Sequence, residues 1–332
     1  MTETRTPRAR LVSTGRFNPQ RVMTNQEMES LVETNDEWIR TRTGIRERRI
    51  ADKDTHASTM AAAAGTMALE RAGLTAGDVD LILLSTATPD RLLPSTACDV
   101  QALMGAKNAG AYDFATACSG FLYGLSMAEA HIAAEQAETV LVVATEKMSS
   151  IIDWTDRATC VLFGDGAGAA VVRRAEGDGR GILSGYMKSD GTLAELLWRP
   201  GGGGRIPLDI MVLDERSHYV KMAGPEVFKS AVRAMCEAAE TALRRAGVTA
   251  EEIDLLVPHQ ANMRIIEATA RYAGIPMDKV FVNVDRYGNM SSASIPVALD
   301  EAVEQGRCGP GSLVLMVAFG AGFTWAANVV RL

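Results

Sequence analysis

Residues 68–81 read ALERAGLTAGDVDL, and residues 242–255 read ALRRAGVTAEEIDL. Nine of the 14 aligned pairs are identical, and the two stretches begin 174 positions apart (68 to 242), about half of the 332-residue chain. Each copy is typical of a helix that stops at an Ala-Gly step and is followed by a turn and a strand. The strands, predicted over residues 81–85 and 253–257, are continuous apolar runs, which indicates sheets buried on both faces. The repeat therefore predicts two similar halves.

A second, weaker similarity is found near the end of each half, where residues 163–171 read FGDGAGAAV and residues 319–329 read FGAGFTWAANV. A long helix is predicted over residues 226–246. Four further apolar runs predict strands over residues 139–144, 169–172, 280–284 and 313–318. Helices and strands that alternate in this way indicate the α/β class. We expect two duplicated α/β halves packed together, over residues 1–174 and 175–332.

The composition excludes several classes of protein. Hydrophobic residues make up 47% and charged residues 23% of the chain, which is ordinary for a globular protein. A net charge of −7 at pH 7 gives no chain-wide basic surface for nucleic acid, and the apolar runs are too short to span a membrane. The first ten residues are polar and do not read as a secretory signal. The five cysteines are scattered without a CxxC pair, so we expect no metal site, no disulfide framework and a cytoplasmic location.

Cys118 stands in YDFATACSGFLYG (residues 112–124), where an apolar strand runs into small residues and then into a helix. A thiol at a helix N-terminus lies near the positive end of the helix dipole, which favours the thiolate and predicts a lowered pKa. The small neighbours leave room for a substrate to approach. The pattern indicates a nucleophile, and the alternative at this point is a buried core cysteine.

Two further residues, His259 and Asn289, lie in local sequence patterns that are typical of functional sites. His259 follows a predicted buried strand, and the strand ends of α/β sheets are where sites are built. Asn289 lies in a Gly-Asn turn, and the repeat maps Cys118 onto residue 292, three positions beyond Asn289. The order Cys, His, Asn also occurs in papain-like proteases. The CGSC-aromatic signature of those proteases is absent, however, and a half-chain repeat has no place in their fold.

Six stretches, taken together, match the motifs of one family: DEWIRTRTGIRER (36–48), DFATACSGF (113–121), FGDGAGAAV (163–171), VPHQANMRI (257–265), GNMSSASIP (288–296) and FGAGFTW (319–325). Over essentially its whole length, the chain resembles β-ketoacyl-acyl carrier protein synthase III, a family of condensing enzymes in the thiolase superfamily. The resemblance implies an α/β fold of five layers, αβαβα, made from two duplicated halves, which agrees with the repeat. It also implies a homodimer.

The resemblance implies a role for each candidate residue. Cys118 would attack an acyl-CoA thioester and hold the acyl group covalently, while the backbone N–H groups of Cys118 and Ala321 bind the oxyanion. Family members often have glycine where this chain has Ala321. His259 and Asn289 would donate hydrogen bonds to the enolate that forms when malonyl-acyl carrier protein loses CO2. A His–Asn pair implies an enzyme primed by acyl-CoA. No cofactor would be bound permanently, because the CoA thioester enters as a substrate.

The resemblance also implies two binding surfaces and one pocket. The adenine of CoA would lie between Trp38 and Arg157, and Arg42 would contact a phosphate group. The pantetheine arm would contact Gly224, Phe228 and Asn262. An acidic carrier protein would dock on Gln260, Ala261, Asn262, Met263 and Arg264, with Lys229 and Arg271 as secondary contacts. Leu93 would close the acyl pocket across the dimer. Acetyl-preferring members often have phenylalanine there, so leucine predicts somewhat longer or branched starters.

Two questions stay open at the level of sequence. The four glycines in RPGGGGRIPLD (residues 199–209) indicate either a flexible surface loop or a mobile flap near a site entrance. The enzyme is expected to initiate fatty acid biosynthesis. The alternative is a ketosynthase or acyltransferase of the same fold that serves specialised metabolism with a different starter or acceptor.

Overall fold

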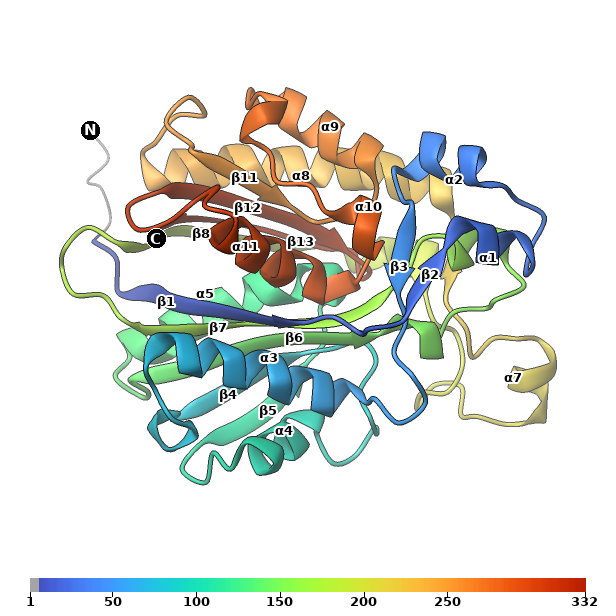
Figure 1. The fold of residues 1–332 in the computed structure, drawn as a ribbon, viewed down its shortest axis with the longest axis horizontal. Coiled ribbons are helices and arrows are strands. Elements are labelled where there is room, and N and C mark those ends of the chain that lie inside the picture. The colour runs from blue at the N-terminus through green and yellow to red at the C-terminus, as the bar shows by residue number, and fades with distance from the viewer. Residues whose placement is uncertain (1–5) are drawn as a thin grey trace.

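The computed structural model describes residues 6–332 and contains two large β-sheets, one above the other in Figure 1. The first sheet has the strand order β1-β7-β6-β4-β5, namely β1 (Ala9–Phe17), β7 (Asp165–Arg174), β6 (Thr139–Lys147), β4 (Leu81–Ser85) and β5 (Gly110–Phe114). The second has the order β11-β12-β13-β8, namely β11 (Leu255–Pro258), β12 (Leu313–Gly320), β13 (Thr324–Arg331) and β8 (Gly181–Ser189). The pairs β4–β5, β4–β6 and β11–β12 are parallel, and the other pairs within these sheets are antiparallel.

Helices form three layers, one on the outer face of each sheet and one between the two sheets (Figure 1). The outer face of the first sheet is covered by α3 (Ala57–Ala72) and α4 (Thr96–Met104), and that of the second by α8 (Gly224–Ala246) and α9 (Met263–Ala273). Between the sheets lie α5 (Gly120–Ala133) and α11 (Ser294–Glu304), whose apolar side chains join both sheets in one buried cluster. The predicted five-layered αβαβα fold is therefore confirmed.

Smaller elements connect these layers. The short strands pair two by two: β2 (Val22–Thr24) with β3 (Glu47–Arg49), and β9 (Leu197–Trp198) with β10 (Lys221–Met222). The short helices are α1 (Asn25–Glu29), α2 (Asp36–Thr43), α6 (Arg157–Cys160), α7 (Ile210–Asp214) and α10 (Val284–Tyr287). Single 3-10 turns are η1 (Ala76–Asp78), η2 (Ala117–Ser119), η3 (Met148–Ser150), η4 (Gly191–Leu196), η5 (Met277–Lys279) and η6 (Ser291–Ala293). Within residues 6–332, no helix is both long and apolar enough to cross a membrane.

The sequence repeat extends to the backbone conformation. The helices α3 and α8 end at Gly73 and Gly247, 174 positions apart, with left-handed φ values of 68° and 70°. The same offset relates Ala117 to Ser291, which share the uncommon φ values of 45° and 46°. Each of these two residues opens a 3-10 turn that leads into a central helix, α5 or α11. The chain passes from β7 to β8 between residues 174 and 181, and the predicted division at 174/175 stays a prediction.

One predicted strand is wrong. Residues 280–284 do not form a strand, because Val280 makes only an isolated bridge with Leu256 and the chain then turns into α10. The backbone N–H groups of Asn283 and Val284 donate to the side chain of Gln260 instead of to a neighbouring strand. An apolar run of this length does not distinguish a strand from a buried connection.

The packing around α5 yields a stability prediction. A Cβ atom on Gly120 would lie 1.7 Å from Ser85 Oγ, and Ser85 is fully buried. We expect Gly120→Ala to lower the free energy of unfolding by about 1–3 kcal/mol, the usual cost of overpacking. Gly77→Ala is the control, because its Cβ would meet only Thr75 Oγ1 at 3.6 Å. The measurement is denaturant unfolding of both variants, and equal stability of the two would contradict the packing argument.

Candidate active site

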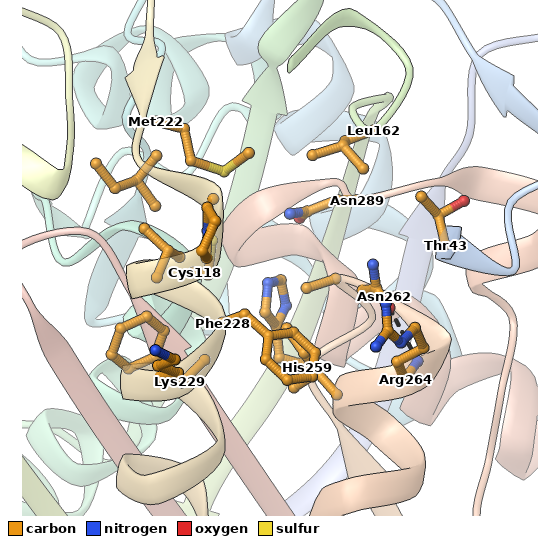
Figure 2. A pocket seen from close by; sticks show the side chains of 18 of the residues that line it. Thr43, Cys118, Leu162, Met222, Phe228, Lys229, His259, Asn262, Arg264 and Asn289 are labelled. Atoms are coloured by element: carbon orange, nitrogen blue, oxygen red, sulfur yellow. Dashed lines mark hydrogen bonds between the residues drawn. The ribbon is translucent and has the colours of Figure 1, made fainter. Parts of the chain in front are cut away.

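The three predicted catalytic residues come from both halves of the chain and line one cavity of about 600 Å3. Cys118 lies in η2 just before α5, His259 directly follows β11, and Asn289 follows α10. Their exposed fractions are only 8%, 3% and 7%. Figure 2 shows the three side chains around the same space. The structure therefore brings together residues that are 141 and 171 positions apart in sequence (118 to 259 and 118 to 289).

Cys118 is a buried thiol. Its Sγ donates to Ser291 Oγ at 3.5 Å, which joins the two equivalent turns of the repeat. Burial raises the pKa of Cys118 to about 12, and the nearby carboxylate of Glu146 acts in the same direction. The predicted lowering of this pKa is wrong, because burial of the thiol disfavours the charged thiolate.

His259 is a buried neutral imidazole. Burial lowers its pKa to about 3, so the ring carries no charge at neutral pH. Its backbone N–H donates to Val317 O at 2.8 Å, which ties the residue to β12. Among residues 6–332, nothing forms a hydrogen bond with His259 Nδ1, although this atom is buried. The ring is therefore held in place by the backbone and by packing, with hydrogen-bonding capacity left for a ligand.

Asn289 is fixed at its backbone and at one end of its amide. Its N–H donates to Leu162 O at 2.8 Å, and its carbonyl accepts from Gly164 N at 3.1 Å. The side-chain Oδ1 accepts from Ser291 N at 2.8 Å. Because Oδ1 is engaged in this way, the NH2 end of the amide is the end left to donate to a ligand.

The backbone around Ala321 lies against the nucleophile turn. A Cβ atom on the preceding residue, Gly320, would lie 2.6 Å from Cys118 N, so the two backbones approach as closely as glycine allows. Ala321 and Cys118 also line a second, smaller cavity. The role of both backbone N–H groups as an oxyanion hole stays a prediction.

That second cavity has a volume of about 130 Å3 and extends from Cys118 into apolar surroundings. Its apolar lining, which the sequence did not reveal, comes from Met148, Ile151, Phe163, Leu197, Trp198 and Val220. These residues lie on four separate segments, and no local spacing relates them. Ser291, also in the lining, could have been found, because the 174-residue offset maps it onto Ala117 beside the nucleophile.

The predicted CoA contacts divide into two groups. Arg42, Gly224, Phe228 and Asn262 line the large cavity. Trp38 does not, but the guanidinium groups of Arg42 and Arg157 both lie 4.8 Å from the centroid of its ring. An aromatic ring inserted between Trp38 and Arg157 needs two van der Waals layers of about 3.5 Å each. The spacing between Trp38 and Arg157 must therefore widen before the predicted sandwich can form. Arg157 Nη1 also donates to Glu33 O at 2.9 Å.

One predicted docking residue is corrected by the structure. Gln260 is fully buried, so its side chain cannot contact a docked protein. Its Nε2 donates to Pro258 O and Phe281 O, and its Oε1 accepts from the backbone N–H groups of Asn283 and Val284. Gln260 therefore joins the end of β11, which carries His259, to the segment that leads to Asn289.

The other predicted docking residues lie at the start of α9. Asn262 caps this helix, because its Oδ1 accepts from Arg264 N at 2.9 Å. Ala261, Asn262 and Met263 are partly exposed, and Arg264 is exposed with its guanidinium 5.4 Å from the centroid of the Phe228 ring. The secondary contacts differ: Lys229 lines the large cavity, whereas Arg271 is exposed in the last turn of α9.

Leu93 does not line either cavity of its own chain. It is 87% exposed, and the neighbouring Leu92 is 81% exposed. Its predicted position in the acyl pocket of a partner subunit stays a prediction.

A cysteine at the junction of two duplicated α/β halves, with a neutral histidine and an asparagine from the second half, defines a thiolase-like condensing enzyme. Family models agree: "3-Oxoacyl-[acyl-carrier-protein (ACP)] synthase III" matches residues 112–191, and its C-terminal counterpart matches residues 243–332. The β-ketoacyl-[acyl-carrier-protein] synthase III of Caldanaerobacter subterraneus is 49% identical over 97% of both chains. The chain belongs to the β-ketoacyl-[acyl-carrier-protein] synthase III family of acyltransferases, and the predicted family, enzyme class and role in initiating fatty acid synthesis are confirmed.

Solved structures give the same result. The synthase III of Aquifex aeolicus VF5 is 48% identical, with a TM-score of 0.90 over 98% of this chain and 100% of its own. The priming β-ketosynthase of the R1128 polyketide pathway is more distant, at 36% identity, with a TM-score of 0.90 over 100% of this chain and 98% of its own.

The burial of His259 leads to a prediction about pH. Its pKa of about 3 lies below the usual 6.5, so between these values the folded chain binds fewer protons at this site than the unfolded chain. The free energy of unfolding should therefore fall as the pH is lowered through this range. NMR of the labelled imidazole should show the neutral form from about pH 8 down to about pH 5. The control is the same signal in denaturant, and a folded-state midpoint near 6.5 would contradict the assignment.

Proposed function

We propose that this enzyme condenses an acyl-CoA starter with malonyl-acyl carrier protein through an acyl-Cys118 intermediate. The observation that carries the proposal is the burial of Cys118, His259 and Asn289, all uncharged, on one cavity. The names of the relatives support an acyl carrier protein as the partner. CoA would enter as a thioester substrate, and no permanently bound cofactor is required.

In the first half-reaction, Cys118 Sγ attacks the thioester carbon of the acyl-CoA. A bond forms between Sγ and the acyl carbon, the bond from that carbon to the CoA sulfur breaks, and the thiol proton ends on the CoA sulfur. The charge that develops on the acyl oxygen would be stabilised by the backbone N–H groups of Cys118 and Ala321. Because burial raises the pKa of Cys118, the thiol must lose its proton as Sγ attacks.

In the second half-reaction, malonyl-acyl carrier protein enters the same cavity and loses CO2. The electron pair left by the broken C–C bond forms an enolate, whose oxygen accepts hydrogen bonds from His259 and Asn289. A neutral imidazole is suited to this role, because it donates without transferring its proton. The enolate carbon then bonds to the acyl carbon, the thioester bond to Sγ breaks, and the Cys118 thiolate takes up one proton.

The large cavity and its rim supply the proposed contacts for both substrates. Phe228, Gly224 and Asn262 would contact pantetheine, and Arg42 would contact a phosphate group. Trp38 and Arg157 would hold adenine once the spacing between them has widened. For the acidic carrier protein, the proposed anchor is Arg264, which is exposed and lines the large cavity.

The small cavity would hold the starter chain. An apolar cavity of roughly 150 Å3 holds one benzene molecule, which has six carbons. The cavity beside Cys118 measures about 130 Å3 and would therefore fit a chain of about four to five carbons. This agrees with the prediction of starters longer than acetyl.

A homodimer is the proposed assembly. β5 lies at the edge of the first sheet, where its free backbone groups can pair with another strand. Exposed apolar side chains gather on and near this strand and on the segments before it, namely Leu92, Leu93, Leu103 and Tyr112. A second copy of the chain would cover them and place Leu93 at its predicted position. The cytoplasmic location stays a prediction.

The alternative role in specialised metabolism rests on the likeness to the R1128 priming β-ketosynthase. That likeness is at 36% identity, against 49% to a synthase III relative, and gives no reason to set aside the role in fatty acid synthesis.

Separate assays of the two half-reactions test the mechanism. In His259→Ala and in Asn289→Ala, acyl-Cys118 should form at close to the wild-type rate. Decarboxylation of malonyl-acyl carrier protein should slow on the order of 100-fold or more, the effect of removing one oxyanion donor. Cys118→Ala is the control and should form no acyl adduct. A variant at 259 or 289 that condenses at the wild-type rate would remove that residue from the mechanism.

Charge reversal at Arg264 tests whether an acidic carrier protein docks at this site. Arg264→Glu should raise KM for malonyl-acyl carrier protein by roughly 3- to 10-fold, with a larger effect at low salt, and should leave acylation by acyl-CoA nearly unchanged. Arg244→Glu, an equally exposed arginine in the last turn of α8, is the matched control. Equal losses with both substrates would place Arg264 in the CoA channel instead.

A further inference from the structure

Residues 199–220 form a long connection between β9 and β10 that extends away from the body of the protein, here called the excursion. The excursion leaves at the end of β9 and returns at the start of β10, and these two strands pair with each other. It contains the four consecutive glycines and the short helix α7, which lies apart from both sheets in Figure 1. Its two ends, at Arg199 and Val220, line the small cavity beside Cys118.

The excursion is closed on itself. Gly201 N donates to Ser217 O at 2.8 Å, and a Cβ atom on Gly201 would lie 2.5 Å from Val212, which is buried. Arg199 Nε donates to His218 O at 2.6 Å. These contacts join the outgoing and returning arms of the excursion to each other.

A single ion pair, supported by one backbone bond, attaches the excursion to the turn that follows η3. Arg216 Nε and Nη2 donate to the two carboxylate oxygens of Asp153 at 2.6 and 2.5 Å. Asp153 is only 4% exposed, and the Arg216 guanidinium holds the pKa of this carboxyl well below its usual range. Val220 N donates to Ile151 O at 3.0 Å. Arg216 adopts a left-handed φ of 54°, uncommon for arginine, so the chain holds an unfavourable backbone conformation where it makes this pair.

The ion pair joins two groups of residues that form the wall of the small cavity. Met148 and Ile151 precede Asp153 on one segment. Leu197 and Trp198 form β9, and Arg199 and Val220 are the two ends of the excursion. The rest of the lining belongs to the nucleophile turn and its neighbours, which are fixed by the core of the fold. The excursion itself supplies Arg199 and Val220 to this lining, so its position affects the part of the cavity wall that these two residues form.

We propose that the Asp153–Arg216 pair determines starter specificity, because it holds residues 199–220 against Ile151 and so limits the length of the acyl chain that fits beside Cys118. This proposal rests on the proposed function, since it assumes that the small cavity holds the acyl group. The pair is bidentate, with the Asp153 carboxylate buried and the Arg216 side chain 45% exposed. Removing Arg216 leaves the carboxylate without its counter-charge, held by the N–H and hydroxyl of Thr155. Without the pair, the excursion can move outward and the cavity can lengthen.

The test compares Arg216→Gly with wild type. Two quantities are measured: hydrogen exchange of residues 199–220, and the rate of Cys118 acylation by acetyl-, butyryl-, hexanoyl- and octanoyl-CoA. We expect faster exchange in this segment, and a ratio of hexanoyl to acetyl rates at least about 10-fold above wild type, the discrimination of one to two methylenes. Glycine removes the guanidinium but also relieves the strain of the left-handed φ and adds backbone freedom. Arg216→Gln, which removes the charge and keeps a side chain at this φ, is therefore measured beside it and should change both quantities in the same direction.

Arg180→Gly is the matched control, because Arg180 pairs with Asp178 at 2.6 Å on the connection between β7 and β8, away from both cavities. Its ratio should equal that of wild type. Arg216→Lys, which keeps the charge but not the bidentate geometry, should give an intermediate ratio and serves if the glycine variant does not fold.

Two results would overturn the proposal: faster exchange with an unchanged ratio, or unchanged exchange of the segment. Wild-type protein that none of the four thioesters acylates would instead overturn the proposed function, so the two failures are distinguishable.

Discussion

The close contact between the two halves at Cys118 is the constraint on which the rest of the site depends. Gly120 packs on Ser85 of β4, and Gly320 of β12 packs on the backbone N–H of Cys118, with no room for a Cβ atom at either glycine. Elements from both sheets therefore meet at the nucleophile turn. The Cys118 thiol donates a hydrogen bond to Ser291, which lies in the equivalent turn of the second half. Duplication of one α/β unit thus places a cysteine turn and an asparagine turn against each other.

Burial at this contact also determines the electrostatics. Loss of hydration keeps Cys118 and His259 uncharged, with the pKa of the thiol raised and that of the imidazole lowered. A buried carboxyl, Glu146, accepts from Ser292 Oγ at 2.7 Å and from Thr88 Oγ1 at 2.9 Å, which ties the second-half turn to the first sheet. The site is therefore a set of positioned neutral hydrogen-bond donors around a thiol, an arrangement suited to stabilising an enolate.

The sequence predicted the architecture because the repeat preserves helix ends and strands at a fixed offset, down to the left-handed glycines 73 and 247. It predicted Cys118, His259 and Asn289 because each follows a strand or a turn with a recognisable local pattern. The sequence did not predict the features that depend on which side chains become buried in the folded chain. Gln260 reads as a polar surface residue but is buried with its amide fully bonded, and the expected pKa of Cys118 neglected desolvation. The small cavity is assembled from distant segments without any local signature.

The most direct test of the account is intact-mass spectrometry of the wild-type chain after incubation with an acyl-CoA in the absence of malonyl-acyl carrier protein, followed by peptide mapping. We expect a mass increase of one acyl group per chain, located on the peptide that contains Cys118, together with release of an equal amount of free CoA. Absence of an adduct, or an adduct on the exposed Cys98 in place of Cys118, would contradict it.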